Sequence, residues 1–184
     1  MRWVIVAIAM LACSPAAAQA PDRGLAARML AIHNRERAQV GAPPLVWSDR
    51  LAADAAAYAP QLVALGGLEH SSNESRPDAG ENLAMGTEGH YSPETLTQLW
   101  IDEKGGFPGG GVYPEPDEDD WSDIDHYTQM VWSGTREVGC AATPGGGNLY
   151  LVCRYAPAGN VIGEPVLLAE SQTETAPEAD GAGR

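Results

Sequence analysis

The stretch DHYTQMVWSGTREVGC, Asp125–Cys140, decides the fold of this chain of 184 residues. His126, Gln129 and Met130 recur at helical spacing and predict a two-turn helix with overlapping polar and apolar faces. Gly134 is expected to end the helix, because glycine readily adopts positive φ, and the rest of the stretch restarts as a strand. The helix would hold His126 in a defined position, as a functional imidazole requires. The alternative is a core helix whose histidine is merely hydrogen-bonded.

The composition indicates one globular domain and excludes a nucleic-acid partner. The length is that of a single domain, and a hydrophobic fraction of 44% is enough for a sizeable core. The formal net charge of −14 leaves no basic face to neutralise phosphates. An acidic balance otherwise indicates solubility and little more.

Residues 1–20 have the pattern of a signal peptide. Arg2 precedes the apolar run Trp3–Ala12, which is too short to span a membrane as a helix. Ala18-Gln19-Ala20 is a small-residue cleavage site, and we expect cleavage after either of its alanines. The protein is therefore expected to be secreted or periplasmic. The alternative is a lipid anchor at Cys13, because the residues before it loosely resemble a bacterial lipoprotein box.

The cysteines predict one disulfide bond. Cys13 would leave with the signal peptide, so Cys140 and Cys153 remain as a single pair in an exported chain. Oxidising compartments favour a bridge between such a pair. The segments Glu137–Ala142 and Leu149–Tyr155 read as a hairpin joined through glycines, which would bring the two cysteines onto facing strands.

Two long segments before the centre of the chain are predicted to be helical. The apolar stripe of Leu25–Val40 is interrupted by Glu36, so its last turn is expected to be partly exposed. The second helix begins at Ser48, which is a suitable N-cap. Pro60 is expected to break or kink this helix near Ala59.

The third helix has the clearest boundaries. Ser92 is its predicted cap and Pro93 its first residue. Leu99, Trp100 and Glu103 are expected to share the buried face. A buried carboxylate needs a partner, so we expect one beside Glu103.

Three other segments have simpler interpretations. Glu81–Ala84 reads as a buried strand that carries a carboxylate. The acidic run Glu115–Asp125 is expected to be a solvated loop, since Ser122 stands where a calcium-binding EF-hand loop needs glycine. The polar residues 170–184 are expected to be disordered. His33 is expected to be a packed, hydrogen-bonded histidine.

Four blocks of sequence together resemble the CAP superfamily, which contains cysteine-rich secretory, antigen 5 and pathogenesis-related proteins. They are AGENLA (Ala79–Ala84), LWIDEK (Leu99–Lys104), HYTQMVW with VGCA (His126–Ala141) and LVCRYAPAGNVIG (Leu151–Gly163). The resemblance implies an α+β fold, a three-layer α-β-α sandwich, as a single domain over residues 25–165. Asn34 and Arg37 are similar to a family motif that ties the first helix to the core.

The resemblance also implies a cleft lined by His70, Glu81, Glu103 and His126, which in the family can bind a divalent metal. Two neutral imidazoles suit zinc, and carboxylates can act as ligands or hold bound water. Such a metal would not be required for the fold. The alternative is a hydrogen-bonded cluster in which each glutamate orients a histidine.

The resemblance implies a secreted binding or effector module that is not an enzyme. The sequence contains no G-x-S-x-G motif for a serine nucleophile. Two alternatives stay open, a metal-dependent hydrolase of peptide or ester bonds and a carrier of lipids or sterols. The partner is unknown, with a lipid, a sterol or a cell-surface ligand as candidates.

Overall fold

The hairpin of β3 (Glu137–Gly145) and β4 (Asn148–Ala156) forms the centre of the sheet. Gly146 and Gly147 join the strands with φ of 59° and 82°. Two successive positive φ values suit a tight hairpin turn, and glycine adopts them without steric cost. The predicted hairpin is confirmed, and it is longer than the sequence pattern indicated.

Two further strands complete a four-stranded mixed sheet with the order β1-β3-β4-β2. The short strand β1 (Val46–Trp47) pairs with β3 in parallel. The strand β2 (Gly80–Thr87) pairs with β4 in antiparallel fashion and forms the opposite edge. The predicted buried strand that carries Glu81 is therefore the edge strand β2. The segments that carry His70 and His126 meet at this strand, as described below.

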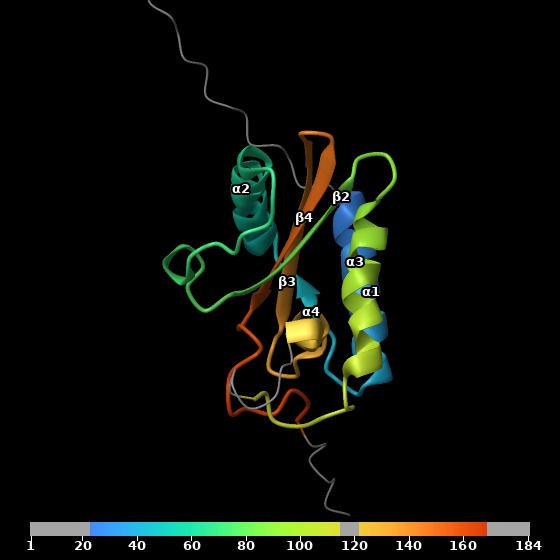
Figure 1. Cartoon of the computed structure of the whole chain (residues 1–184). Coiled ribbons are helices and arrows are strands. Elements are labelled where there is room, and N and C mark those ends of the chain that lie inside the picture. The colour runs from blue at the N-terminus through green and yellow to red at the C-terminus, as the bar shows by residue number, and fades with distance from the viewer. Residues whose placement is uncertain (1–22, 115–121, 169–184) are drawn as a thin grey trace, which may run out of the picture.

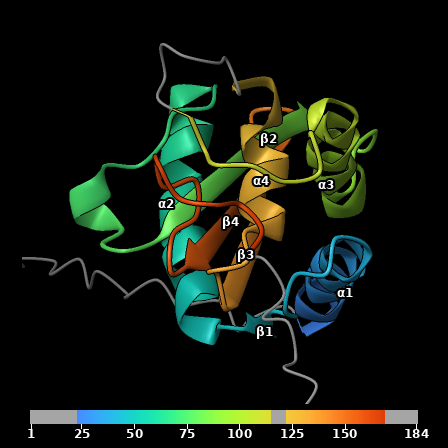
Figure 2. The ribbon, with the colours of Figure 1, turned by 90° about the horizontal axis from the view of Figure 1, so that it is seen from below.

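Helices cover both faces of the sheet (Figures 1 and 2). The helix α2 (Asp49–Leu65) packs on one face against β3 and β4. The other face carries α1 (Arg23–Gln39), α3 (Pro93–Asp102) and α4 (Asp125–Val131), which also contact one another. This is the expected α+β fold, a three-layer α-β-α sandwich.

The computed structural model describes residues 23–114 and 122–168. The predicted signal peptide with Cys13, most of the acidic run from Glu115 and the tail 170–184 lie outside the described residues. Within the described ranges, no helix has both the length and the apolarity needed to cross a membrane.

A glycine in β3 permits the close approach of α2 to the sheet. A Cβ atom built on Gly139 would lie 2.3 Å from the backbone nitrogen of Ala52 and 2.5 Å from the carbonyl oxygen of Ser48. Backbone atoms of a helix start have little room to yield, so only glycine fits here. Ser48 is the N-cap residue of α2 as predicted, although its side chain makes no capping hydrogen bond.

The last turn of α1 is partly exposed as expected, with Ala38 and Gln39 at the surface, but Glu36 and Arg37 are buried. Glu36 is 4% exposed and hydrogen-bonds to Arg35 and Lys104. Arg37 is fully buried. Its guanidinium donates hydrogen bonds to four carbonyl oxygens, those of Pro43 after α1, Met130 at the end of α4, and Trp132 and Thr135 after α4. Arg37 thus ties α1 to the core, as the family motif implied.

His33 is packed in the core as expected. Its Nδ1 donates to the carbonyl oxygen of Met29 at 2.7 Å, and its Nε2 accepts from the hydroxyl of Tyr155 at 2.8 Å. Burial lowers the pKa of His33 from 6.5 to about 4, and the charge of Arg37 acts in the same direction, against the hydrogen bond to Met29. The ring is therefore neutral at physiological pH.

The expected break at Pro60 is wrong, because α2 runs without interruption from Asp49 to Leu65. Pro60 lies on the exposed side of the helix, where water can satisfy the carbonyl that loses its partner. The buried residues Ala55, Ala59 and Leu62 hold both halves of the helix on the sheet. Packing on the sheet outweighs the local preference.

The start of α3 is as predicted, but its end and its buried face are not. Ser92 and Thr95 form a reciprocal capping box before the helix. Leu99 is 46% exposed, and the buried face is formed by Leu96, Thr97, Trp100 and Ile101. Glu103 lies beyond the helix, at the start of the 3₁₀ turn Glu103–Gly106. The buried face of α3 is rotated by one residue from the predicted face, so Ile101 is buried in place of Leu99.

The helix α4 is shorter than expected, because it ends at Val131 and not at Gly134. Trp132 follows with φ of −53° and ψ of 115°, an extended conformation that leaves the helix without a left-handed residue. The predicted disulfide is confirmed. Cys140 and Cys153 lie opposite each other in the β3–β4 ladder and are bonded.

Candidate functional site

His126 is held by a carboxylate and by an aromatic ring. The first turn of α4 presents its imidazole to Glu103, whose Oε1 accepts a hydrogen bond from Nδ1 at 2.6 Å. The other oxygen of Glu103 accepts from the backbone nitrogen of Tyr127 at 2.9 Å. The ring of Trp100 stacks on that of His126, with centroids 5.9 Å apart and an angle of 11° between planes. The expected partner of Glu103 is therefore His126.

His70 is held by a second carboxylate. It lies in the segment between α2 and β2, and its Nδ1 is 3.0 Å from Oε1 of Glu81. The side chain of His70 is 55% exposed, whereas that of Glu81 is fully buried. The ring is thus anchored at one edge and open to solvent at the other.

Glu81 is surrounded by donors. Besides His70, its carboxylate accepts from the backbone nitrogen of Ser71 at 2.9 Å, from the Ser71 hydroxyl at 2.8 Å and from Nη2 of Arg154 at 3.2 Å. Burial alone would raise the pKa of the Glu81 carboxyl. The hydrogen bonds from His70 and Ser71 and the charge of Arg154 outweigh burial and place the pKa below its ordinary value. Glu81 is therefore ionised at neutral pH.

The two hydrogen bonds determine what each neutral histidine offers to a ligand. An ionised carboxylate only accepts hydrogen bonds, so Nδ1 carries the proton in both His70 and His126. The lone pair of a neutral ring is then on Nε2, at the edge away from the carboxylate. Metal-binding histidines in proteins are commonly oriented in this way by a carboxylate.

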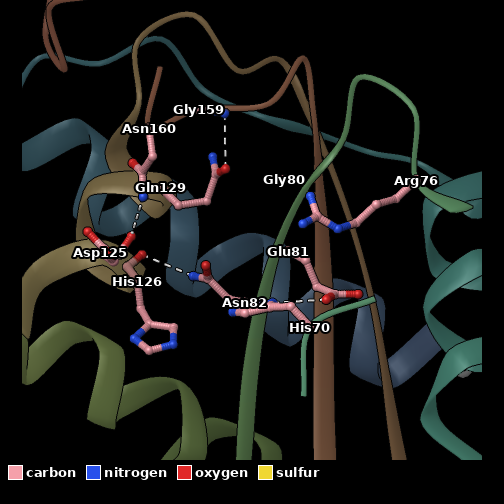
Figure 3. A pocket seen from close by; sticks show the side chains of 10 residues that line it. All are labelled: His70, Arg76, Gly80, Glu81, Asn82, Asp125, His126, Gln129, Gly159 and Asn160. Carbon is pink, nitrogen blue, oxygen red and sulfur yellow. Dashed lines mark hydrogen bonds and ion pairs between the residues drawn. The ribbon is translucent and has the colours of Figure 1, made fainter. Parts of the chain in front are cut away.

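Both histidines line one pocket of about 250 Å³ at the edge of the sheet (Figure 3). Consecutive strand residues point to opposite faces, so β2 directs Asn82 toward His126 and Glu81 toward His70 (Figure 3). The pocket therefore lies across the edge strand β2, between α4 and the segment that follows α2. Its other lining residues are Arg76, Gly80, Asp125, Gln129, Gly159 and Asn160.

Gln129 forms the wall of the pocket behind His126. Its Oε1 accepts from the backbone nitrogen of Gly159 at 3.0 Å, and its Nε2 donates to the Thr135 hydroxyl at 3.3 Å. A Cβ atom on Gly80 would lie 1.9 Å from Oε1, and one on Gly159 would lie 2.6 Å from Nε2. The two glycines leave the space that this amide needs.

The four predicted residues are brought together as two pairs around one pocket. Among the residues that the structure describes, no three His, Cys, Asp or Glu side chains form a ready-made metal site. Three contacts of the site were not predicted from the sequence, namely those of Ser71 and Arg154 with Glu81 and the stacking of Trp100 on His126. Trp100 was predicted to be buried. The pairing of Glu81 with Arg154 depends on the register of β2 and β4, which cannot be read from the sequence pattern.

Comparison with known proteins gives consistent matches. The model of the cysteine-rich secretory protein family (CAP) matches residues 30–155. The chain is 38% identical over 136 residues to pathogenesis-related protein 1C of Nicotiana tabacum, covering 72% of this chain and 74% of that protein. It is 33% identical over 151 residues to secreted protein RBT4 of Candida albicans, covering 77% and 37%. The crystal structure of NaASP2 with Zn²⁺ is similar with a TM-score of 0.69 and 25% identity, covering 80% and 89%.

Proposed function

This chain belongs to the cysteine-rich secretory protein family, and from that premise we propose that it is an exported binding or effector module with a metal-capable cleft between His70 and His126. One observation carries the proposal. Two imidazoles, each held at Nδ1 by a carboxylate, line the same pocket. The Nε2 atoms would bind a divalent metal, with zinc as the ion that best suits imidazole ligands.

The two glutamates orient the histidines in this proposal. Glu81 is fully buried and already accepts four hydrogen bonds, so it is poorly placed to become a ligand itself. Glu103 is 18% exposed and accepts from His126 and from the backbone of Tyr127. Glu103 could add a carboxylate oxygen only by giving up these bonds. We therefore assign the ligand role to the two imidazoles.

The position of His70 allows it to respond to a metal. It lies outside the helices and strands, and more than half of its side chain is exposed. The ring of His126 is fixed between Glu103 and Trp100 and provides the rigid half of the site. A bound ion would supply a positive centre with free positions for an oxygen ligand of the partner. The crystallisation of the related NaASP2 with Zn²⁺ supports this choice of metal.

We propose binding and not catalysis as the role of the cleft. Glu81 and Glu103 each hold a histidine, and Asp125, which also lines the cleft, accepts from the Tyr113 hydroxyl, so none of the three is placed as a free general base. The relatives named above as secreted and pathogenesis-related proteins support an effector role outside the cell. Export would remove residues 1–20 and leave residues 25–165 as the CAP domain. N-terminal sequencing of the exported protein tests this. A start at Gln19 or Pro21 is expected, and a lipid-modified Cys13 would show a membrane-anchored protein instead.

Calorimetric titration with zinc chloride tests the metal proposal. The wild-type protein is expected to bind one zinc ion per chain, and His70→Ala and His126→Ala are expected to abolish this binding. His90→Ala is the matched control, because His90 is exposed and lies outside the pocket. Binding should weaken on acidification, since protons compete with zinc for the ring nitrogens.

The circular dichroism spectra and the unfolding transitions of all variants show whether the fold is retained. Equal zinc binding by the wild type and both pocket variants would place the metal elsewhere. The two pairs would then be a structural cluster of hydrogen bonds.

A further inference from the structure

A second pocket, of about 440 Å³, lies between α2 and the segment that follows it. Figure 1 shows this segment looping out beside α2, on the face of the sheet opposite α1 and α3. His70 and Ser71 belong to the pocket wall, and Arg154 of β4 also lines it. His70 thus separates this second pocket from the cleft described above.

Arg154 gives the second pocket a donor held in a fixed position. It is 4% exposed, and its Nη2 donates to the hydroxyl of Ser71 and to Glu81. Within the described part of the chain, its Nε is buried without a hydrogen-bond partner. The N–H groups of a buried guanidinium normally have acceptors. Arg154 therefore favours a ligand with an uncharged oxygen acceptor, because Glu81 already balances its charge.

Acceptors line the other side of the second pocket. Asp54 and Gln61 project from α2, and Glu69 faces them from the following segment. Gln61 and Glu69 are exposed, and the Asp54 carboxylate shares an exposed ion pair with Arg50 at 3.3 Å. Planar amide and carboxylate groups can each accept hydrogen bonds from two neighbouring hydroxyls.

Tyr58 fixes the shape of the second pocket. Its hydroxyl donates to the carbonyl oxygen of Glu69 at 2.6 Å, which fastens the segment to α2. Its ring lies 5.6 Å from the guanidinium carbon of Arg154. An aromatic side chain among planar polar groups offers both an apolar surface and hydrogen bonds to a ligand.

The charges of the second pocket disfavour anions. The carboxylates of Asp54 and Glu69 repel anions, in a chain whose net charge is −14. The guanidinium of Arg154 does not offset this repulsion, because Glu81 already balances its charge. From this arrangement we infer that the second pocket binds a neutral polyhydroxylated ligand, such as a sugar ring. The ligand hydroxyls donate to Gln61 and Glu69, and a ligand oxygen accepts from Arg154.

An array of immobilised neutral, sialylated and sulfated oligosaccharides, probed with the purified chain, tests this inference. Neutral oligosaccharides are expected to bind and the charged ones are not. Gln61→Ala and Glu69→Gln should each weaken the binding of the best neutral oligosaccharide by about tenfold in a calorimetric titration, the loss of one or two hydrogen bonds. Both residues are exposed, so both variants are expected to fold.

Two controls separate this site from others. Gln98→Ala changes an exposed glutamine on α3, outside the second pocket, and should leave binding unchanged. His126→Ala removes the proposed zinc ligand and should also leave sugar binding unchanged, so the two proposals stand or fall separately. Absence of neutral binders, a preference for charged glycans, or binding that survives both pocket variants would overturn the inference. Binding of a free amino acid without binding of any sugar would also overturn the inference.

Discussion

Glu81 of β2 and Arg154 of β4 are directly opposite each other in the antiparallel ladder, and their buried side chains are joined at 3.2 Å. The side chain of Glu81 is fully buried and that of Arg154 is 5% exposed. The same carboxylate holds His70, which lines both pockets. One ion pair therefore supports the walls of two pockets.

Removing either member of this pair should destabilise the fold. Arg154→Met or Glu81→Gln leaves the other charge buried without its partner, at a cost of about 3 kcal/mol in the free energy of unfolding. The double variant should lose clearly less than the sum of the single losses, because no unpaired charge remains. Urea unfolding of the four proteins measures this coupling. Additive losses would show that the two charges do not depend on each other.

Replacing Glu103 should weaken zinc binding without abolishing it. Glu103→Gln keeps the size of the side chain but weakens the hydrogen bond that orients His126, so zinc affinity should fall about tenfold to a hundredfold. His126→Ala should abolish binding. Calorimetry with zinc chloride distinguishes the two effects. An unchanged affinity in Glu103→Gln would exclude an orienting role for this carboxylate.

Removing the disulfide should lower stability by about 3 kcal/mol in the chain-entropy model. Cys140→Ser and Cys153→Ser together leave the hairpin intact but free the unfolded chain from its cross-link. Chemical unfolding of the double variant measures the loss. Intact-mass measurement of the exported wild type, with and without reductant, should show a gain of two hydrogen atoms on reduction. Two free thiols in unreduced exported protein would contradict the prediction.

The fold should lose stability on acidification because of His33. The folded pKa of about 4 lies below the ordinary 6.5, so below pH 6.5 the unfolded state binds a proton that the folded state excludes. The stabilisation from the neutral His33 ring is fully present above the ordinary pKa. It is lost as the pH falls toward about 4, and the free energy of unfolding decreases by about 3 kcal/mol.

Urea midpoints between pH 7.5 and pH 4 test this prediction. His33→Gln should show a shallower dependence of the free energy of unfolding on pH than the wild type. His90→Gln, at an exposed histidine, should show the wild-type slope. Equal slopes in all three proteins would mean that His33 is not the responsive group.

A methyl group at Gly139 should disrupt the packing of α2. The Cβ atom of Gly139→Ala would meet the backbone of Ala52 and Ser48 at less than 3 Å, and relief requires α2 to move away from the sheet. We expect a loss of about 3 kcal/mol or more, or a failure to fold. Gly67→Ala is the matched control, since nothing lies within 4 Å of its added Cβ. The thermal midpoints of both variants provide the test.

Elements with local boundary signals could be predicted from the sequence. Ser92 and Pro93 mark the start of α3, and the glycines of the hairpin turn mark its reversal. The pair Cys140 and Cys153 followed from the count of cysteines in an exported chain. Each of these signals acts within a few residues or through chemistry that allows only one partner.

Features that depend on packing across the sheet could not be predicted. Glu81 and Arg154 are 73 residues apart, and their pairing depends on the β2–β4 register. Pro60 stays in a helix because the buried face of α2 is held on the sheet. The resemblance named the four cleft residues, but which glutamate holds which histidine followed only from the position of β2.

The hydrogen bonds of Arg37 have a consequence for the order of folding. This residue belongs to the first helix, yet three of its acceptor carbonyls lie 93 to 98 positions later in the chain. The guanidinium and these carbonyls remain without their native partners until α4 and the turn before β3 have emerged and docked. Such long separations slow folding. The first helix therefore cannot reach its native environment early in synthesis, and the chain completes its core only when nearly all of the domain is present.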